Sequence, residues 1–355
     1  MRITRELDLT ISGLMCSSME LNSDISQIAT RPGSARLLTM ALVVALSSIA
    51  ACSTPRTAPP PSSGAPVSDS SRASLEEIRK TIEALRPVGV ALAAPQPGDW
   101  RERFTEPPQT FDEYLASEPS VARDDRRKLY VQPLGEFSPA RRKIVDLTAE
   151  FLGDYFGLEV VTLQPRSLDK VPFDSQREGV TGRQILAGYI VDRMLAPEVP
   201  ADGAVLVGLT DVDLYPEPSW NFVFGVANLK ARAGVWSMAR LGFPDDGPGS
   251  FRQCLLRTLK IATHETGHAF SLPHCVLYRC SMNGSNSLDE TDKCPLDLCP
   301  ECTGKLAWAT SVNARARLER IEAFCKRNGL ASEAALASMS LAAMAKPAVT
   351  QSAPG

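Results

Sequence analysis

Histidine and cysteine, the side chains that most often bind zinc through nitrogen and sulfur, are concentrated in one short part of this sequence. The chain has 355 residues but only three histidines, and all three lie between His264 and His274. Five of the nine cysteines follow directly, in residues 275–302. This concentration predicts transition-metal binding, and the spacing within the segment indicates which side chains would bind.

The segment 264–274 reads HETGHAFSLPH. Residues four apart on a helix project from the same face, so His264 and His268 could bind one zinc ion. A chain reversal near Pro273 would bring His274 to the same ion as a third ligand. Three protein ligands leave a coordination position for water, which is typical of a catalytic zinc rather than a structural one.

Glu265 directly follows the first of these histidines and could reach a water molecule at the open position. Zinc lowers the pKa of bound water to about 7 and polarises a carbonyl group. Glu265 would then act as general base, accepting the water proton and passing it to the leaving amine. A chance match on a surface helix is the alternative, and the third histidine at a suitable spacing argues against it.

The cysteines form two pairs on either side of a loop. Cys275 and Cys280 come first, and Cys299 and Cys302 follow as a CxxC motif. Two such pairs predict a closed, tetrahedral structural zinc site with four cysteine ligands. Two alternatives stay open: the cysteines could form disulfides in an oxidising compartment, or Cys294 could replace one of the four ligands.

The N-terminal part of the chain resembles the leader of a bacterial lipoprotein. Residues 37–51 are an apolar run, short for a membrane-spanning helix but normal for a signal peptide. The run ends before Cys52, as in a lipobox, so we expect residues 1–51 to be a signal peptide and Cys52 to carry the lipid. An ordinary signal peptide with an incidental cysteine, or a misjudged start codon, is the alternative.

A Pro- and Ser-rich tether follows over residues 52–73. The expected location is therefore outside the cytoplasm, with the protein lipid-anchored to the cell envelope. An Asp directly after the lipidated cysteine is the bacterial signal against sorting to the outer membrane. Ser53 stands at that position, so we expect the protein at the outer membrane, on its periplasmic side or at the surface.

Beyond the tether, the pattern predicts a folded region of class α/β (α+β) around one mixed sheet. A capping box of Ser74 and Glu77 begins a helix, and an irregular segment continues to residue 128. This segment could cover the cleft as an inhibitory element, with Asp112 and Glu113 as its acidic candidates. A metallopeptidase domain is expected over 129–345 and a disordered tail over 346–355.

Within that domain, periodicity predicts strands and helices in alternation. The expected strands are 129–131, 160–163, 204–209, 221–227 and 235–241. A helix should begin at Ser138, which is a good N-cap before a proline at the first helical position. The further expected helices are 181–196, 252–270 and a helical zone over 306–326.

The long signature resembles the archaemetzincins, a family in the metzincin clan of zinc peptidases. The resemblance is carried by the histidine motif with Cys275, by Cys280-x-Met282-Asn283, and by Cys299-x-x-Cys302 with Lys305-Leu306 after it. It also covers residues 210–215, 221–227 and 234–241, and it spans about residues 129–307.

The resemblance implies a metzincin-like fold with a twisted mixed sheet above the cleft and an active-site helix below. It also implies two zinc ions per chain, the structural one stabilising a small C-terminal helical subdomain. Met282 would be the residue of the Met-turn under the zinc ligands, and its plain alternative is an ordinary core methionine. The strand 221–227 would be the rim against which an extended peptide substrate could pair.

One position departs from the family pattern. Ser271 stands where the family usually has glycine, at the turn between the second and third histidines. That turn is expected to need a positive φ, which costs a non-glycine residue about 1 kcal/mol or more. Three metal bonds can absorb this cost, so we expect zinc binding to survive.

The leading interpretation is a zinc metallopeptidase, an endopeptidase or aminopeptidase, that is monomeric and acts on peptides or proteins. With 38 Lys and Arg against 41 Asp and Glu, the net charge of −3 argues against a dedicated nucleic-acid binder. A catalytically weak or inactive zinc- or peptide-binding lipoprotein of the same fold is the second interpretation. A thiol-exchange protein using Cys299 and Cys302 is the third.

Overall fold

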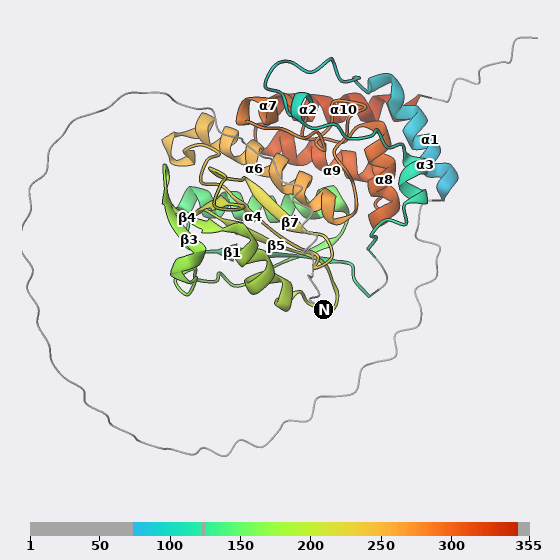
Figure 1. Ribbon diagram of the computed structural model, residues 1–355. Coiled ribbons are helices and arrows are strands. Elements are labelled where there is room, and N and C mark those ends of the chain that lie inside the picture. Colours follow the sequence, from blue (N-terminus) through green and yellow to red (C-terminus); the bar gives the residue numbers. More distant parts are fainter. Residues whose placement is uncertain (1–73, 123–124, 347–355) are drawn as a thin grey trace, which may run out of the picture. The chain divides into compact units, whose positions relative to one another are not determined.

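The computed structural model describes residues 74–122 and 125–346 (Figure 1). The expected signal peptide, the lipidation site Cys52, the tether and residues 347–355 of the expected tail lie outside the described residues. Within the described part, no helix has the length and apolar character that crossing a membrane requires.

The central sheet has five strands in the order β2-β1-β5-β8-β7. Strands β1, β2, β5 and β8 are parallel to their neighbours, while β7 pairs antiparallel with β8 at one edge. Every residue of β5 is buried, as its continuous apolar run predicts. The bounds are β1 Lys128–Leu134, β2 Glu159–Thr162, β5 Gly203–Thr210, β7 Gly225–Asn228 and β8 Ala233–Ser237.

A second, smaller sheet holds β3 (Gln176–Gly179), β4 (Gly182–Leu186) and β6 (Asp213–Tyr215). The mixed α/β class is therefore confirmed, with the strands divided between two mixed sheets. The helix expected over 181–196 is wrong in its first part, because β3 and β4 form a hairpin there. Gly182 turns the chain with a φ of 100°, and helical structure begins only at Ala187.

The helices begin largely where the sequence predicts. Ser74 and Glu77 form the expected capping box, and the Ser138 hydroxyl accepts a hydrogen bond from Arg141 N. The zone 306–326 is two helices, because Ser311 adopts a φ of 62° between them. The longer helices are α1 Leu75–Leu85, α4 Pro139–Phe156, α6 Pro248–Ala269, α8 Pro300–Thr310, α9 Ala314–Arg327 and α10 Ala331–Ala345.

Shorter helical elements lie in the connections. They are α2 Trp100–Arg103, α3 Phe111–Ala116, α5 Ala187–Tyr189 and α7 Leu288–Lys293, a π-helical turn Ile190–Leu195, and 3₁₀ turns Arg86–Val88, Phe173–Ser175, Ala196–Glu198 and Pro244–Asp246. Two of them, α2 and α3, fall in the segment that the sequence predicts to be irregular.

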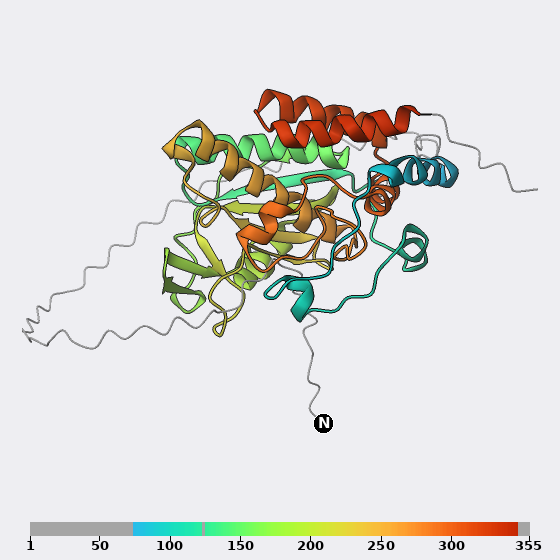
Figure 2. The ribbon, with the colours of Figure 1, turned by 90° about the horizontal axis from the view of Figure 1, so that it is seen from above.

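Helices lie on both faces of the central sheet (Figures 1 and 2). The sheet separates two hydrophobic cores. Along β5, Val205 and Val207 face the core shared with α4 and α6, while Leu206 faces the core shared with residues 185–195. This alternation follows from the two-residue period of a strand. Ile82 of α1 and Phe111 of α3 belong to the first core, so the N-terminal segment packs as part of the same folded unit.

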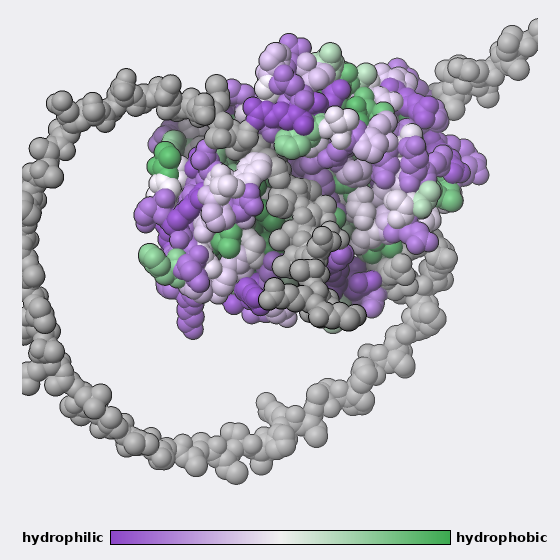
Figure 3. Space-filling view, in the orientation of Figure 1, coloured by the Kyte–Doolittle hydropathy of each residue, from purple (hydrophilic) through white to green (hydrophobic). Residues whose placement is uncertain are grey.

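The surface is of mixed polarity. On the face in Figure 3, outside the grey atoms, hydrophobic side chains are scattered among hydrophilic ones.

Candidate metal centres

The three histidines meet at the end of α6. His264 and His268 lie on the last turns of this helix, which ends at Ala269. The chain then reverses and returns His274, so that one ligand nitrogen from each histidine lies within 4.8 Å of the other two. The predicted reversal is therefore confirmed, and the side chains are 1%, 3% and 7% exposed.

Hydrogen bonds hold each imidazole ring by its Nδ1 atom. The acceptors are Ser281 O at 2.9 Å from His264, Leu272 O at 2.7 Å from His268, and Glu106 Oε1 at 2.9 Å from His274. Oxygen acceptors at these positions require the proton on Nδ1 and leave the lone pair on Nε2.

The Nε2 atoms therefore need a cation between them. Those of His264 and His268 are 3.0 Å apart, and His274 Nε2 is buried with no hydrogen-bond partner among the described residues. Buried lone pairs that face one another without a proton are costly unless a positive charge binds them. Histidine nitrogens whose rings are held by an oxygen acceptor at the other nitrogen are typical of zinc sites, so the residues fit a zinc ion.

Burial also keeps the rings in the form that binds metal. It lowers the pKa of His264 to about 3, with the neighbouring His274 adding to the effect. Burial likewise lowers the pKa of His268 well below its ordinary value. Both rings are therefore neutral at pH 7, with no proton to displace from Nε2.

Glu265 lies between α6 and the edge strand of the central sheet. Its side chain is buried, and a Cβ added at Gly225 of β7 would be 3.2 Å from Glu265 Cγ. The strand predicted over 221–227 is shorter than expected and begins at Gly225, because Val223 makes only an isolated bridge to Leu214.

The register of β7 leaves part of its backbone directed away from β8. Phe224 O accepts a hydrogen bond of 2.8 Å from Ser237 N, so Phe224 occupies a hydrogen-bonded position. Gly225 and Ala227 then occupy the alternate positions, where N–H and C=O groups face the opposite side. Since no further strand pairs with β7 in the described residues, these groups face the sheet edge.

Met282 packs beneath the turn of α6 that carries the histidines. It is buried, and a Cβ at Gly267 would lie 2.6 Å from its sulfur atom. Its carbonyl accepts a hydrogen bond of 2.7 Å from Cys275 N. The absence of a side chain at Gly267 thus permits the close approach of Met282.

The four predicted cysteines form a second cluster, with all Sγ atoms within 4.8 Å of one another. The Sγ atoms of Cys275 and Cys299 are 3.7 Å apart. Tetrahedral zinc, with Zn–S bonds of about 2.3 Å, places its sulfurs about 3.8 Å apart, whereas a disulfide needs about 2.05 Å. The seven cysteines of the described residues are all free, so the geometry fits zinc and the disulfide alternative is wrong.

Hydrogen bonds link the sulfurs of the cluster to one another and to the start of α8, and they favour the charged form at Cys275, while burial raises the pKa of Cys280 and Cys299 well above the ordinary value. Cys299 caps the N-terminus of α8, accepting a hydrogen bond from Cys302 N, and its own N–H donates to Cys280 Sγ at 3.2 Å. Hydrogen bonds from Cys280 and the other two thiols lower the pKa of Cys275 below its ordinary value. Complete burial of the CxxC pair also makes the thiol-exchange interpretation unfavourable.

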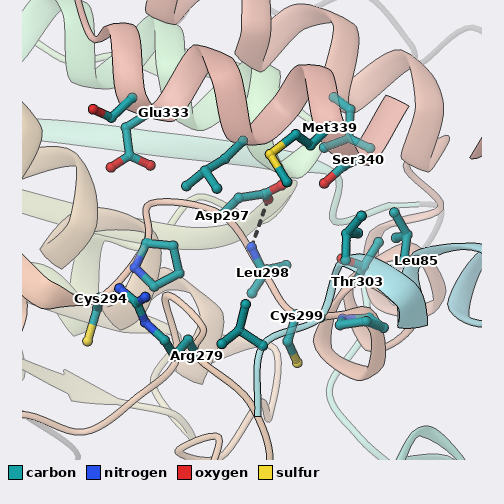
Figure 4. Close-up of a pocket in the computed structure, with 18 of the residues that line it drawn as sticks. Leu85, Arg279, Cys294, Asp297, Leu298, Cys299, Thr303, Glu333, Met339 and Ser340 are labelled. Carbon is teal, nitrogen blue, oxygen red and sulfur yellow. Dashed lines mark hydrogen bonds between the residues drawn. The ribbon is translucent and has the colours of Figure 1, made fainter. Parts of the chain in front are cut away.

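Cys294 does not replace a member of the cluster. Its Sγ instead donates a hydrogen bond of 3.5 Å to Glu290 O, and burial raises its pKa to about 11. It lines a cavity of about 270 Å³ between α1, α10 and residues 292–300 (Figure 4). Cys299 is the one cluster residue that lines this cavity, and none of the histidines does.

The acidic residue that reaches the histidines differs from the expected ones. Asp112 pairs with Arg79 at 2.7 Å, and Glu113 caps its own helix through Thr110. Glu106, which the sequence analysis missed, contacts His274 instead. No local pattern distinguishes Glu106 from other acidic residues of this segment, so sequence alone offered no signal for it.

Ser271 adopts the positive φ that its position predicts, at 61°. Its hydroxyl accepts a hydrogen bond of 3.0 Å from Ser120 N. The backbone cost of a non-glycine residue in this conformation is thereby offset in part by a contact that glycine cannot make.

A buried HExxH helix beside an edge strand, with a third histidine returned to it, defines the class of zinc metallopeptidases. The comparisons with known proteins give the family. Residues 198–308 match the model of Peptidase family M54. Archaemetzincin-2 of Macaca fascicularis is 35% identical over 251 residues, which cover 60% of this chain and 68% of that protein.

The chain is also similar to an archaeal protein and to a protein of known crystal structure. The archaemetzincin of Thermococcus kodakarensis is 40% identical over 161 residues, covering 44% of this chain and 85% of its own. The crystal structure of the Methanopyrus kandleri archaemetzincin is 34% identical and covers 54% of this chain and 98% of that one, with a TM-score of 0.44. The chain belongs to the archaemetzincin family and is a zinc metallopeptidase.

Ser271 provides a test of the turn between the ligands. Ser271→Ala keeps the positive φ but removes the hydrogen bond to Ser120, so the free energy of unfolding should fall by about 1 kcal/mol. Ser271→Gly removes both the bond and the strain, which are of similar size, and should unfold close to wild type. Urea unfolding of the zinc-loaded proteins measures this, and equal stability of the two variants would contradict it.

Proposed function

We propose that this chain hydrolyses peptide bonds at a zinc ion bound by His264, His268 and His274, with Glu265 as the general base. The observation that carries the proposal is the convergence of three Nε2 lone pairs, each fixed by a hydrogen bond at Nδ1. When bound there, zinc supplies a Lewis acid that acidifies water and polarises a carbonyl group.

Glu265 is placed to move the proton. Its carboxylate lies on α6 directly after His264 and beside β7. It would accept the proton of the attacking water and deliver it to the leaving nitrogen, which divides the reaction into attack and C–N cleavage. A site that only binds zinc or peptide has no use for this carboxylate, which weighs against the inactive-lipoprotein alternative.

The edge of β7 would hold the substrate. Gly225 and Ala227 direct backbone N–H and C=O groups to the sheet edge, and Gly225 lies against Glu265. An extended peptide that pairs with these groups would run past the general base as an added strand. The substrate class is therefore an extended peptide or an unfolded protein segment, recognised first by its backbone.

The four cysteines would hold a second, structural zinc. Four sulfur ligands from Cys275, Cys280, Cys299 and Cys302 would fill the coordination positions of a zinc ion and leave none for water, which is typical of a structural site. Its function would be to hold the loop 275–299 against α8, since both elements contribute ligands. The proposed content is two zinc ions per chain, one catalytic and one structural.

The location is a separate proposal that rests on the leader sequence alone. Export, lipid attachment at Cys52 and anchoring in a bacterial envelope would place the peptidase outside the cytoplasm. Peptides in that compartment would be its substrates.

Metal analysis of the purified protein tests the two-site assignment. Wild type should contain two zinc ions per chain, and His268→Ala should contain one, because only the histidine site loses a ligand. Cys302→Ser should lower the zinc content and also reduce folding, since structural zinc contributes to stability directly. A single zinc that depends only on the cysteines would overturn the peptidase assignment.

Glu265→Gln tests the general base. The variant should keep both zinc ions but lose peptide hydrolysis by about 100-fold or more, the usual contribution of general-base catalysis. Cleavage of a mixture of quenched fluorescent peptides measures this, with Glu136→Gln, an exposed residue before α4, as the matched control. Full activity of Glu265→Gln would remove this residue as base, and no activity in wild type would favour the inactive alternative.

Cys52→Ser tests the anchor. The wild-type protein should fractionate with membranes when the full chain is expressed in a bacterium, and the variant should move to the soluble fraction. If the variant stays with the membranes, the lipobox interpretation is wrong.

A further inference from the structure

The third histidine differs from the other two in the group that holds its ring. His264 and His268 donate from Nδ1 to main-chain carbonyls, which the local fold of residues 264–281 supplies. His274 instead meets a side-chain carboxylate, Glu106 Oε1 at 2.9 Å, from a residue 168 positions earlier in the chain. A substitution can therefore remove this acceptor without changing the backbone around the histidines.

We propose that Glu106 is a positioning residue for the catalytic zinc, and that it makes the segment before β1 a working part of the metal site. By accepting the Nδ1 proton, it holds His274 in the tautomer whose Nε2 lone pair faces the other two histidines. A carboxylate in this position also raises the basicity of the ring as a ligand. The inference rests on the proposed function, in which the three histidines bind zinc.

The chain on one side of Glu106 is anchored against the histidine site. The Trp100 ring, which is 4% exposed, lies 4.5 Å from the His274 ring. It occupies the space over Gly284, where a Cβ would be 2.4 Å from the indole. Trp100 N also donates a hydrogen bond of 2.9 Å to Glu290 Oε1, which ties α2 to α7.

The chain on the other side of Glu106 is anchored to the helix of the CxxC motif. Lys305 Nζ donates to Gln109 O at 2.7 Å and to Gln109 Oε1 at 3.0 Å. Phe111 N donates to Glu301 Oε2 at 2.8 Å, and Glu301 stands between the two cysteines of the motif. The helix that closes the cysteine cluster thus also positions the loop that carries Glu106.

These contacts give the segment a supporting role rather than a blocking one. Glu106 contacts Nδ1, on the side of the His274 ring away from the Nε2 atom that would bind zinc. Its side chain is 32% exposed, so the carboxylate stays partly hydrated while it accepts the bond. An inhibitory segment would instead direct a metal-binding group toward the Nε2 side of the rings, where His274 Nε2 has no hydrogen-bond partner among the described residues.

The test compares Glu106→Ala and Glu106→Gln in the full chain, with Glu136→Gln as the matched control. Competition with a zinc chelator measures the Kd of the weaker site. Glu106→Ala should weaken zinc binding there by about 10- to 100-fold, the usual effect of losing the hydrogen-bond acceptor that orients a histidine ligand. Glu106→Gln should lose less, because an amide oxygen still accepts the Nδ1 proton, and the control should match wild type.

Kinetic constants and the zinc retained by the cysteine cluster distinguish a positioning role of Glu106 from a general loss of folded structure. At saturating zinc, Glu106→Ala should lower kcat with little change in KM, and one tightly held zinc should remain at the cysteines. Wild-type zinc affinity in Glu106→Ala, or an equal loss in Glu136→Gln, would overturn the inference. If His268→Ala still held two zinc ions, the proposed function itself would fail. Wild-type zinc affinity in Glu106→Ala would overturn only the inference about Glu106, so the two failures can be distinguished.

Discussion

The peptide bond between His274 and Cys275 joins the two ligand clusters, and much of the molecule depends on this junction. Adjacent side chains point into different sites, one toward the histidines and one toward the sulfurs. The backbone here must satisfy both geometries at once. Cys275 N donates to Met282 O, so the turn under the histidines is tied to the start of the cysteine cluster. Zinc in either site would therefore hold the chain that supplies the other.

Both clusters are buried, and this makes metal binding a matter of stability as well as chemistry. Neutral imidazoles and clustered thiols away from water are expensive unless a cation or hydrogen bonds satisfy them. Oxygen atoms of the protein accept a hydrogen bond from Nδ1 of each ring, and N–H groups at the start of α8 donate to the sulfurs of Cys280 and Cys299. An ion bound at the Nε2 atoms and among the sulfurs would satisfy the remaining lone pairs, and its binding would be coupled to folding.

Several features were predictable because they are local. The spacing of His264 and His268 on one helix face and the reversal to His274 follow from helix geometry and local turn chemistry, and the positive φ at Ser271 was implied by the glycine that the family has there. The hairpin of β3 and β4 was not predicted, because a short apolar run fits a strand and a helix equally well. The turn at Gly182 is local, but the parallel pairing of β4 with β6 joins β4 to a strand that follows β5 in the chain, and a local pattern does not contain that pairing.

The sequence by itself determined which side chains are the candidates for binding metal, which carboxylate is the candidate general base, and which family the chain resembles. Those properties depend on the types of the residues and on their separation over a few positions, and both can be read directly from the sequence. Only the tertiary structure decided that Glu106 holds His274, that Cys294 stays outside the sulfur cluster, and that the edge of β7 passes Glu265. These contacts join residues far apart in the chain. The sequence contains many acidic, sulfur and backbone groups of the same type, and only the packing of the whole fold decides which of them come into contact.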